Sequence, residues 1–263
     1  MAAFGLELER LLTAFSYFSR LPVPDRVQQS HHELNRAARY FPLVGIAVGS
    51  MAAGSLVVGG WIWPLPVAVV LSMLSGIVLT GAMHEDGLAD TTDGFGGGSD
   101  RERVLAIMQD PRSGSFGVVA LVLALLGKFS MLADLSRIDV GLAAWTLIVS
   151  HGVSRASALV VMARLPYARA NAPGRAGAIV RDIGSAEWMI GVFIGLVPLS
   201  IAVGLGLIDV SSALHGLLAV ALVSSLSSSY YRHRIGGYTG DCLGATQQIS
   251  ELAFYLAILG LSS

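Results

Sequence analysis

An acidic stretch followed by glycines, residues 81–98, holds the densest group of chemically capable side chains in this 263-residue chain. It places Asp86, Asp90 and Asp93 at positions i, i+4 and i+7, so on a helix the three carboxylates would share one face. Carboxylate oxygens suit Mg²⁺, which usually takes one or two of them together with phosphate oxygens. The spacing therefore predicts that Asp86, Asp90 and Asp93 bind Mg²⁺ and that phosphoryl-group chemistry occurs beside them. The alternative is a solvated acidic loop at a membrane surface.

A second polar group follows within the same connection. Arg101, Arg103 and Asp110 alternate there with apolar residues at helical spacing. We expect Arg101 and Arg103 to bind phosphate oxygens, and Asp110 to act as a further metal ligand or as a general base. An ordinary amphipathic interfacial helix is the alternative.

Charged residues also interrupt the apolar segments. Lys128, the only lysine, lies near the middle of one such segment, where a charge is costly unless it faces the bundle interior. Its predicted partner is a carboxylate of another segment or a substrate phosphate. Arg155 follows His151 by four residues, which predicts either a hydrogen-bonded pair that locks two helices or a polar wall of a substrate cavity. Glu251 also needs a partner if it is buried.

A glycine-rich stretch near the carboxyl end, residues 234–244, contains Gly237, Thr239 and Asp241. Free backbone N–H groups among glycines can hold an anion, so this stretch is predicted to be a second phosphate cradle. A flexible turn is the alternative.

The composition is that of a membrane protein. Hydrophobic residues make up 54% of the chain and charged residues only 13%, and the mean hydropathy is +0.66. The single cysteine, Cys242, excludes a disulfide framework, and a net charge of −1 gives no reason to expect nucleic acid as a partner. The first 20 residues contain Glu7, Glu9, Arg10 and Arg20, so we do not expect a cleavable signal.

The apolar pattern predicts an all-α fold, a polytopic integral membrane helical bundle with about seven transmembrane helices. We expect one membrane domain, 1–263, with an N-terminal segment at 1–40 and an acidic active-site loop at 84–114. Residues 4–21 predict an amphipathic interfacial helix. Abundant small residues favour close packing between helices, and a homo-oligomer stays open. The predicted spans are 41–62, 65–83, 115–133, 140–162, 187–207, 210–229 and 242–261.

Positive charge predicts the orientation. Fourteen of the 17 Lys and Arg residues lie in alternate connections, whereas the other three connections contain only Arg137. The positive-inside rule then places the N-terminus and the 84–114 loop in the cytoplasm.

These motifs, taken in order, resemble the cobalamin synthase family (adenosylcobinamide-GDP ribazoletransferase). The resemblance covers nearly the whole chain. It rests on His84-Glu85-Asp86-Gly87-Leu88-Ala89-Asp90-Thr91-Thr92-Asp93-Gly94, Arg101-Glu102-Arg103, Ile107-Met108-Gln109-Asp110 and Gly236-Gly237-Tyr238-Thr239-Gly240-Asp241-Cys242-Leu243-Gly244-Ala245, with support from Arg20-Leu21-Pro22 and Phe41-Pro42-Leu43-Val44-Gly45. The chain departs from the family pattern at Gln109, where a lysine is often found.

The resemblance implies a multi-pass enzyme of the bacterial inner membrane with its active site toward the cytoplasm. It would join α-ribazole, or its 5′-phosphate, to adenosylcobinamide-GDP with release of GMP, using Mg²⁺. The catalytic residues would be Glu85, Asp86, Asp90 and Asp110. The proton acceptor would be Glu85, His84 or Asp110. Substrate binding is expected from His84, Arg101, Arg103, Lys128, Arg155, Gly237, Thr239 and Asp241.

Two other functions fit parts of the sequence. A membrane phosphotransferase of the CDP-alcohol type also places spaced aspartates at a helix end, but its pattern has Arg where this chain has Asp90. A transporter could use Lys128, Arg155 and Glu251 along an ion path. The transporter reading is weakened because the densest polar chemistry lies at 84–114.

Overall fold

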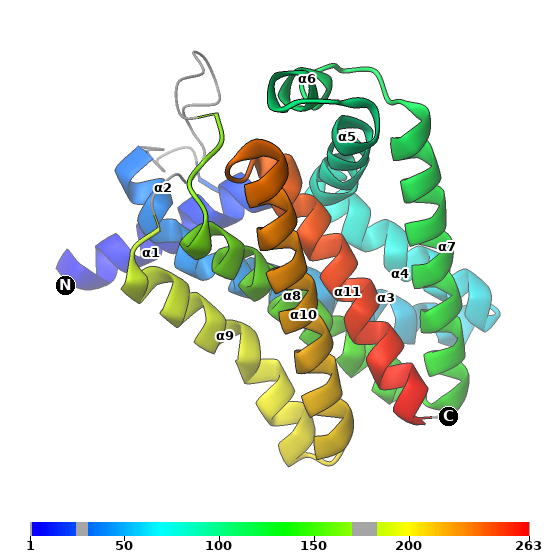
Figure 1. Ribbon diagram of the computed structural model, residues 1–263. Coiled ribbons are helices and arrows are strands. Elements are labelled where there is room, and N and C mark those ends of the chain that lie inside the picture. Colours follow the sequence, from blue (N-terminus) through cyan, green and yellow to red (C-terminus); the bar gives the residue numbers. More distant parts are fainter. Residues whose placement is uncertain (1, 25–30, 170–182, 263) are drawn as a thin grey trace.

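The computed structural model describes residues 2–24, 31–169 and 183–262, and every regular element in these ranges is helical (Figure 1). This confirms the all-α fold. The elements are α1 (Ala2–Phe18), α2 (His31–Ala37), the 3-10 helix η1 (Ala38–Tyr40), α3 (Phe41–Ile62), α4 (Leu65–Thr80), α5 (Met83–Gly97), α6 (Arg101–Ile107), α7 (Ser115–Ile138), α8 (Val140–Arg164), α9 (Ser185–Gly204), α10 (Val210–Ile235) and α11 (Gly240–Ser262).

The helices form a membrane bundle, as predicted. Within the described ranges, five helical stretches are long and apolar enough to cross a membrane: Leu34–Ile62, Ser115–Ile138, Val140–Arg164, Ser185–Gly204 and Val210–Ile235. Helices α4 and α5 meet the same criteria only as a bent pair, so these ranges contain five spans, or six if the pair counts as one span, against the seven predicted. The seventh predicted span is α11, in which Gln247, Gln248 and Glu251 interrupt the apolar pattern.

A sharp bend separates α4 from α5, and the sequence analysis did not predict it. The two helices differ in direction by 84° across Gly81 and Ala82. Both linking residues have left-handed backbone conformations, with φ of 65° and 58°, and Gly81 caps α4. The backbone N–H of Arg20 donates to the carbonyl of Leu79 at 2.7 Å, so the segment after α1 is fastened to the end of α4. The bend redirects the acidic stretch away from the axis of α4.

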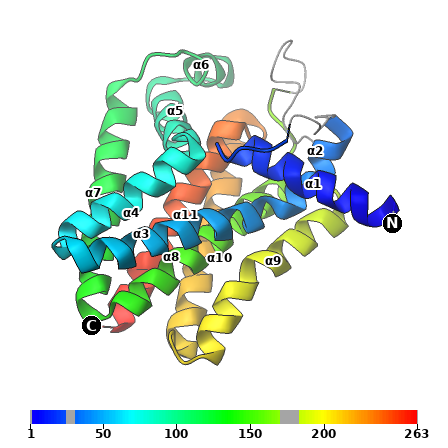
Figure 2. The ribbon, with the colours of Figure 1, turned by 180° about the vertical axis from the view of Figure 1, so that it is seen from behind.

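Helix α8 lies at the centre of the bundle, where α3, α9, α10 and α11 pack around it (Figures 1 and 2). Its most apolar stretch is 83% buried, compared with 28% for α7, α9 and α10. Close approach depends on glycines, because a Cβ on Gly45 of α3 would lie 2.3 Å from the carbonyl oxygen of His151. A central helix surrounded on all sides can carry polar side chains that never meet lipid.

The predicted amphipathic helix at the amino end is α1. It buries Ala14 and Phe18, exposes Leu6 and Leu8, and directs Glu7 toward the next helical segment. Glu7 accepts hydrogen bonds from Tyr40, at 2.6 Å, and from Arg39.

Connections that carry the basic residues meet at one end of the bundle. Arg101 of α6 donates to the carbonyl oxygens of Ile235 and Ala168, each at 2.9 Å. Arg234 of α10 donates to the carbonyl of Gly98 at 2.7 Å. The segment after α8 and the end of α10 therefore contact α6, and Figure 1 shows the end of α10 and the start of α11 next to α5 and α6 at this end of the bundle.

Candidate active site

Helices α5 and α11 cross in close contact at two glycines. A Cβ on Gly87 would lie 2.9 Å from the backbone oxygen of Asp241, and a Cβ on Gly244 would lie 3.2 Å from the backbone of His84. Neither position has room for a larger side chain. The crossing therefore holds the first turn of α11 directly against the acidic helix.

Three carboxylates gather at this crossing, and we call Asp86, Asp90 and Asp241 the acidic cluster. Asp86 is exposed, whereas Asp90 and Asp241 are half-buried. Asp90 lies in the electrostatic field of the other two carboxylates and of the Arg169 guanidinium. Arg169 Nη2 donates to Asp241 Oδ2 at 3.3 Å. One guanidinium among three carboxylates leaves an excess of negative charge that favours a cation.

The predicted ligand set of Asp86, Asp90 and Asp93 is not assembled. Among the described residues, no group of three or more His, Cys, Asp or Glu side chains is close enough to hold a metal ion by itself. Asp93 is buried, and its two carboxylate oxygens accept backbone N–H groups of Gly114 (2.7 Å) and Gly117 (2.8 Å) at the start of α7. It therefore connects α5 to the N-terminus of α7, a favourable place for a carboxylate.

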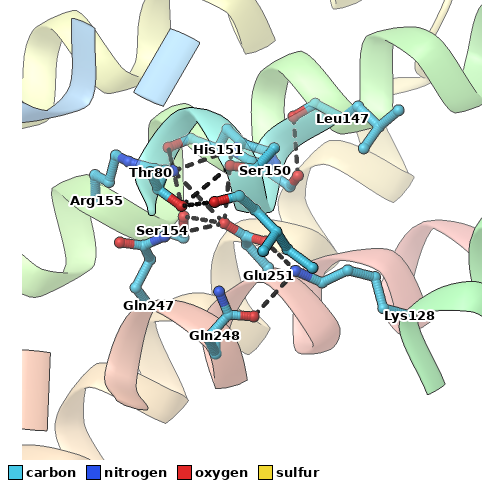
Figure 3. Close-up of polar contacts among 12 residues, drawn as sticks. Thr80, Lys128, Leu147, Ser150, His151, Ser154, Arg155, Gln247, Gln248 and Glu251 are labelled. Atoms are coloured by element: carbon cyan, nitrogen blue, oxygen red, sulfur yellow. Dashed lines mark hydrogen bonds and ion pairs between the residues drawn. The ribbon is translucent and has the colours of Figure 1, made fainter. Parts of the chain in front are cut away.

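Glu85 belongs to a different environment from its neighbour Asp86. Its Oε1 accepts a hydrogen bond of 3.0 Å from Gln248 Nε2, while Gln248 Oε1 accepts one of 3.0 Å from Lys128 Nζ. Lys128 Nζ also lies 2.7 Å from Glu251 Oε2, and this pair is almost completely buried. A chain of polar contacts thus leads from Glu85 at the start of α5 into the bundle interior. Figure 3 shows its inner part, from Gln248 through Lys128 to Glu251.

Glu251 is the centre of this interior network. Its Oε1 lies 3.5 Å from Arg155 Nη1, 3.8 Å from His151 Nδ1 and 3.2 Å from the Gln247 amide nitrogen (Figure 3). Arg155 Nη1 also donates to the carbonyl of His151 at 2.9 Å, which confirms the predicted i, i+4 relationship. The predicted carboxylate partner of Lys128 is thereby found in another helix. Lys128 and Arg155 are turned to Glu251 rather than to the acidic cluster, so their expected contact with substrate is not supported by this arrangement.

A cavity of about 20 Å³ lies within the same network and is bordered by His84, Glu85, Arg155 and Gln247. Each of these side chains has a buried polar atom that lacks a hydrogen-bond partner in the structure: His84 Nε2, Glu85 Oε2, Arg155 Nε and Gln247 Oε1. A cavity of this size and polarity suits one bound water molecule.

The predicted phosphate-binding arginines and Asp110 lie elsewhere. Two guanidinium nitrogens of Arg101 donate to backbone carbonyls and hold α6 in place, so this side chain has a structural role. Arg103 is exposed on α6. Asp110 is paired with Arg112, whose guanidinium and backbone N–H donate to it at 2.6–3.0 Å. These bonds lower the pKa of Asp110 to about 2, which makes it a poor general base at neutral pH.

The predicted cradle at 234–244 is instead a packed corner. A Cβ on Gly237 would lie 2.2 Å from the carbonyl oxygen of Pro166, so this glycine allows two backbones to touch. The N–H of Tyr238 donates to that same carbonyl at 3.0 Å and is not free for an anion. Thr239 is fully buried and donates to Asp241 Oδ2 at 3.2 Å, which helps to orient that carboxylate.

A larger cavity of about 260 Å³ adjoins the acidic cluster. It is bordered by Asp86, Asp241 and the glycines at the start of α11 on one side. Its other walls are His84 and the apolar side chains Tyr17, Phe18, Phe41, Met83, Met162 and Leu243, and we call it the aromatic cavity. The sequence analysis missed this cavity and Arg169, because the residues come from five distant segments and have no shared spacing.

Sequence comparison places this chain among known proteins. The family described as cobalamin-5-phosphate synthase matches residues 10–259. A protein of Shewanella amazonensis, named adenosylcobinamide-GDP ribazoletransferase, is 44% identical over 263 residues, which cover 100% of this chain and 99% of the relative. A protein of the same name from Shewanella sp. strain W3-18-1 is 41% identical over 258 residues, 98% of this chain and 96% of the relative.

A third relative of that name, from Shewanella baltica strain OS185, is 40% identical over 254 residues, or 96% of this chain and 94% of the relative. No solved structure matches the chain. The family match and the identities over almost full length are both well beyond chance likeness, so this chain belongs to the cobalamin-5-phosphate synthase family.

Proposed function

We propose that this protein is the transferase that joins α-ribazole, or its 5′-phosphate, to adenosylcobinamide-GDP and releases GMP. Two relatives named adenosylcobinamide-GDP ribazoletransferase cover 100% and 98% of the chain. The observation that carries the proposal at the level of residues is the acidic cluster. Its excess negative charge at the α5–α11 crossing is suited to a cation that accompanies a diphosphate. This observation favours a phosphotransferase over a transporter.

The reaction is a displacement at the phosphorus atom attached to cobinamide. A ribose hydroxyl of α-ribazole that is free also in the 5′-phosphate, and therefore not the 5′-hydroxyl, forms a new bond to that phosphorus through its oxygen, the bond to GMP breaks, and GMP departs with the electron pair. The hydroxyl proton must pass to a base. Asp110 is unsuited to that role because its bonds with Arg112 lower its pKa to about 2, so its carboxylate has little affinity for a proton at neutral pH. Glu85 Oε2 and His84 Nε2 are buried without partners next to the cluster, so each has a free position for a proton.

A magnesium ion fits the donor chemistry of the cluster. One or two of the carboxylates of Asp86, Asp90 and Asp241 would hold it, and substrate phosphate oxygens and water would complete its coordination, as is usual for Mg²⁺. When bound, Mg²⁺ would neutralise charge that develops on the departing phosphate. Asp93 is left out of this set because its oxygens hold the start of α7.

The site would face the cytoplasm of a bacterium, with the protein in the inner membrane as a multi-pass chain. The support is the gathering of basic connections at the end of the bundle that carries the acidic cluster. A homo-oligomer is compatible with this arrangement, and the acidic cluster is built from one chain.

The direct test uses purified protein in liposomes with adenosylcobinamide-GDP, α-ribazole and Mg²⁺, followed by chromatography of nucleotides and corrinoids. We expect one GMP for each joined corrinoid, and loss of both products with EDTA. Release of GMP without a joined corrinoid would indicate a hydrolase. No reaction from folded protein would contradict the proposal and favour the CDP-alcohol type of phosphotransferase.

A further inference from the structure

The aromatic cavity lies between the ends of several helices, at the boundary between the apolar core and the acidic cluster. Tyr17 and Phe18 come from α1, Phe41 from the start of α3, Met162 from α8 and Leu243 from α11. Phe18 and Phe41 are nearly completely buried, at 9% and 4% exposure. The inner wall of the cavity is therefore part of the core, whereas Met83 and Asp86, which are exposed, form its outer edge.

One wall of this cavity is a stack of rings. The Phe18 and Phe41 rings lie 4.1 Å apart with 27° between their planes, and the His84 ring continues the stack 6.0 Å from Phe41 at 26°. Arg155 stands over Phe41, with its Cζ 5.7 Å from the ring centroid. Packed rings and polarisable thioethers favour a flat aromatic ligand. They disfavour a free phosphate, whose charge would lose its hydration without compensation.

The polar groups of the cavity are few and specifically placed. Asp86 and Asp241 border it and also belong to the acidic cluster. His84 and Tyr17 also carry polar groups and line the wall. The cavity thus offers an apolar ring site with two polar side chains in its wall and carboxylates at one side. Sites for small molecules commonly combine an apolar lining with a small number of placed polar groups.

We propose that the aromatic cavity binds the benzimidazole base of α-ribazole and directs its ribose toward the acidic cluster. This inference rests on the proposed function. The base is flat and apolar, and its one unsubstituted ring nitrogen needs only a single hydrogen-bond donor. Guanine fits less well, because it has several donors and acceptors around its edge and the described wall offers few partners.

The geometry also explains how two substrates can share one site. The carboxylates Asp86 and Asp241 lie between the aromatic cavity and Asp90, so a base in the cavity brings the sugar to the side where a diphosphate would be held. Alignment of the nucleophile by binding its non-reacting part is a large source of rate enhancement. The ribazole nucleoside would thus be positioned through its base and its hydroxyl left free to react.

The test is to fill the cavity and measure the binding of each substrate separately by calorimetry in detergent. Met162→Phe places a larger ring in the aromatic cavity, while Val160→Phe, on the same helix, fills a different cavity between α8, α9 and α10. We expect Met162→Phe to raise the Kd for α-ribazole about tenfold or more, with the Kd for adenosylcobinamide-GDP within about twofold of the parent. Val160→Phe should change neither value.

Two further measurements keep the inference open to refutation. Leu243→Phe fills the same cavity from α11 and should act as Met162→Phe does, should the first variant fold poorly. In the cavity variants, the loss of affinity should also be smaller for the riboside of unsubstituted benzimidazole, because this base lacks the two methyl groups that the base of α-ribazole carries. Unchanged α-ribazole binding in a folded cavity variant, or equal losses for both substrates, would overturn the assignment. Failure of the proposed function would appear differently, as no joined corrinoid from the unmodified protein.

Discussion

Asp93 Oδ2 lies 2.7 Å from the backbone nitrogen of Gly114, and this bond joins the acidic helix to the start of α7. The second oxygen accepts from Gly117 at 2.8 Å, so the whole carboxylate is used in the contact. Asp93, the i+7 member of the set, therefore anchors α5 to α7, whereas Asp86 and Asp90 remain available for chemistry.

We expect Asp93→Asn to lower the stability of the folded protein and to leave its affinity for Mg²⁺ nearly unchanged. The amide keeps one acceptor oxygen and turns its NH₂ group toward a backbone N–H, so we expect a loss of about 1–3 kcal/mol of stability. Thermal unfolding in detergent would measure it. The affinity for Mg²⁺ with substrate should stay within about threefold of the parent in protein that remains folded. A large loss of Mg²⁺ affinity with unchanged stability would return Asp93 to the ligand set.

The α5–α11 crossing should be intolerant of a single methyl group. Gly87→Ala would put a Cβ 2.9 Å from the Asp241 backbone oxygen and force the two helices apart. We expect turnover to fall by roughly 10- to 100-fold, since displacements of about 1 Å at a site have effects of this size. The control is Gly60→Ala on α3, where a Cβ would meet nothing within 4 Å. Equal activity of the two variants would show that the crossing does not position the carboxylates.

Loss of the Glu251 carboxylate should lower the stability of the protein more than loss of one of the two cations that it binds. Glu251→Gln leaves Lys128 and Arg155 buried without their common partner, for which the expected cost is about 3–5 kcal/mol. In Lys128→Met, Glu251 still has Arg155. The double variant, Glu251→Gln with Lys128→Met, should therefore lose less stability than the sum of the losses in the two single variants. Strict additivity in thermal unfolding would contradict a coupled network.

Orientation can be tested with a membrane-impermeant maleimide, since the one native cysteine, Cys242, is buried. Arg112→Cys lies in the connection beside the acidic cluster, and Arg137→Cys lies at the opposite end of the bundle; both side chains are exposed. We expect Arg112→Cys to react in inverted vesicles only, and Arg137→Cys in intact spheroplasts only. The reverse pattern would place the acidic cluster outside the cytoplasm.

Local patterns in the sequence predicted the elements well. Apolar segments at 41–62, 140–162 and 210–229 correspond to α3, α8 and α10, because a long apolar run has few other options in a membrane. The costly charge of Lys128 correctly predicted a buried carboxylate partner. The sequence analysis did not predict the 84° bend, since its backbone signal rests on Gly81 together with an alanine in a left-handed conformation.

Helical spacing also could not assign the partner of each side chain. It correctly grouped Asp86, Asp90 and Asp93 on one face, but which neighbouring helix covers that face is a property of the tertiary packing. The glycines near Gly237 suggested an anion cradle, whereas they serve backbone contact with Pro166. Glycine permits both uses, and only the neighbouring chain distinguishes them.

The most direct test of this account compares two substitutions within residues 84–114, each of which replaces a carboxylate by an uncharged amide. Asp90→Asn removes a carboxylate of the acidic cluster, and Asp110→Asn removes one that is paired with Arg112. Joined corrinoid would be measured with adenosylcobinamide-GDP, α-ribazole and Mg²⁺ in liposomes. We predict a fall of at least about 100-fold for Asp90→Asn and less than about threefold for Asp110→Asn. Near-normal turnover by Asp90→Asn, or an equal collapse in both variants, would contradict a reaction centred on the α5–α11 crossing.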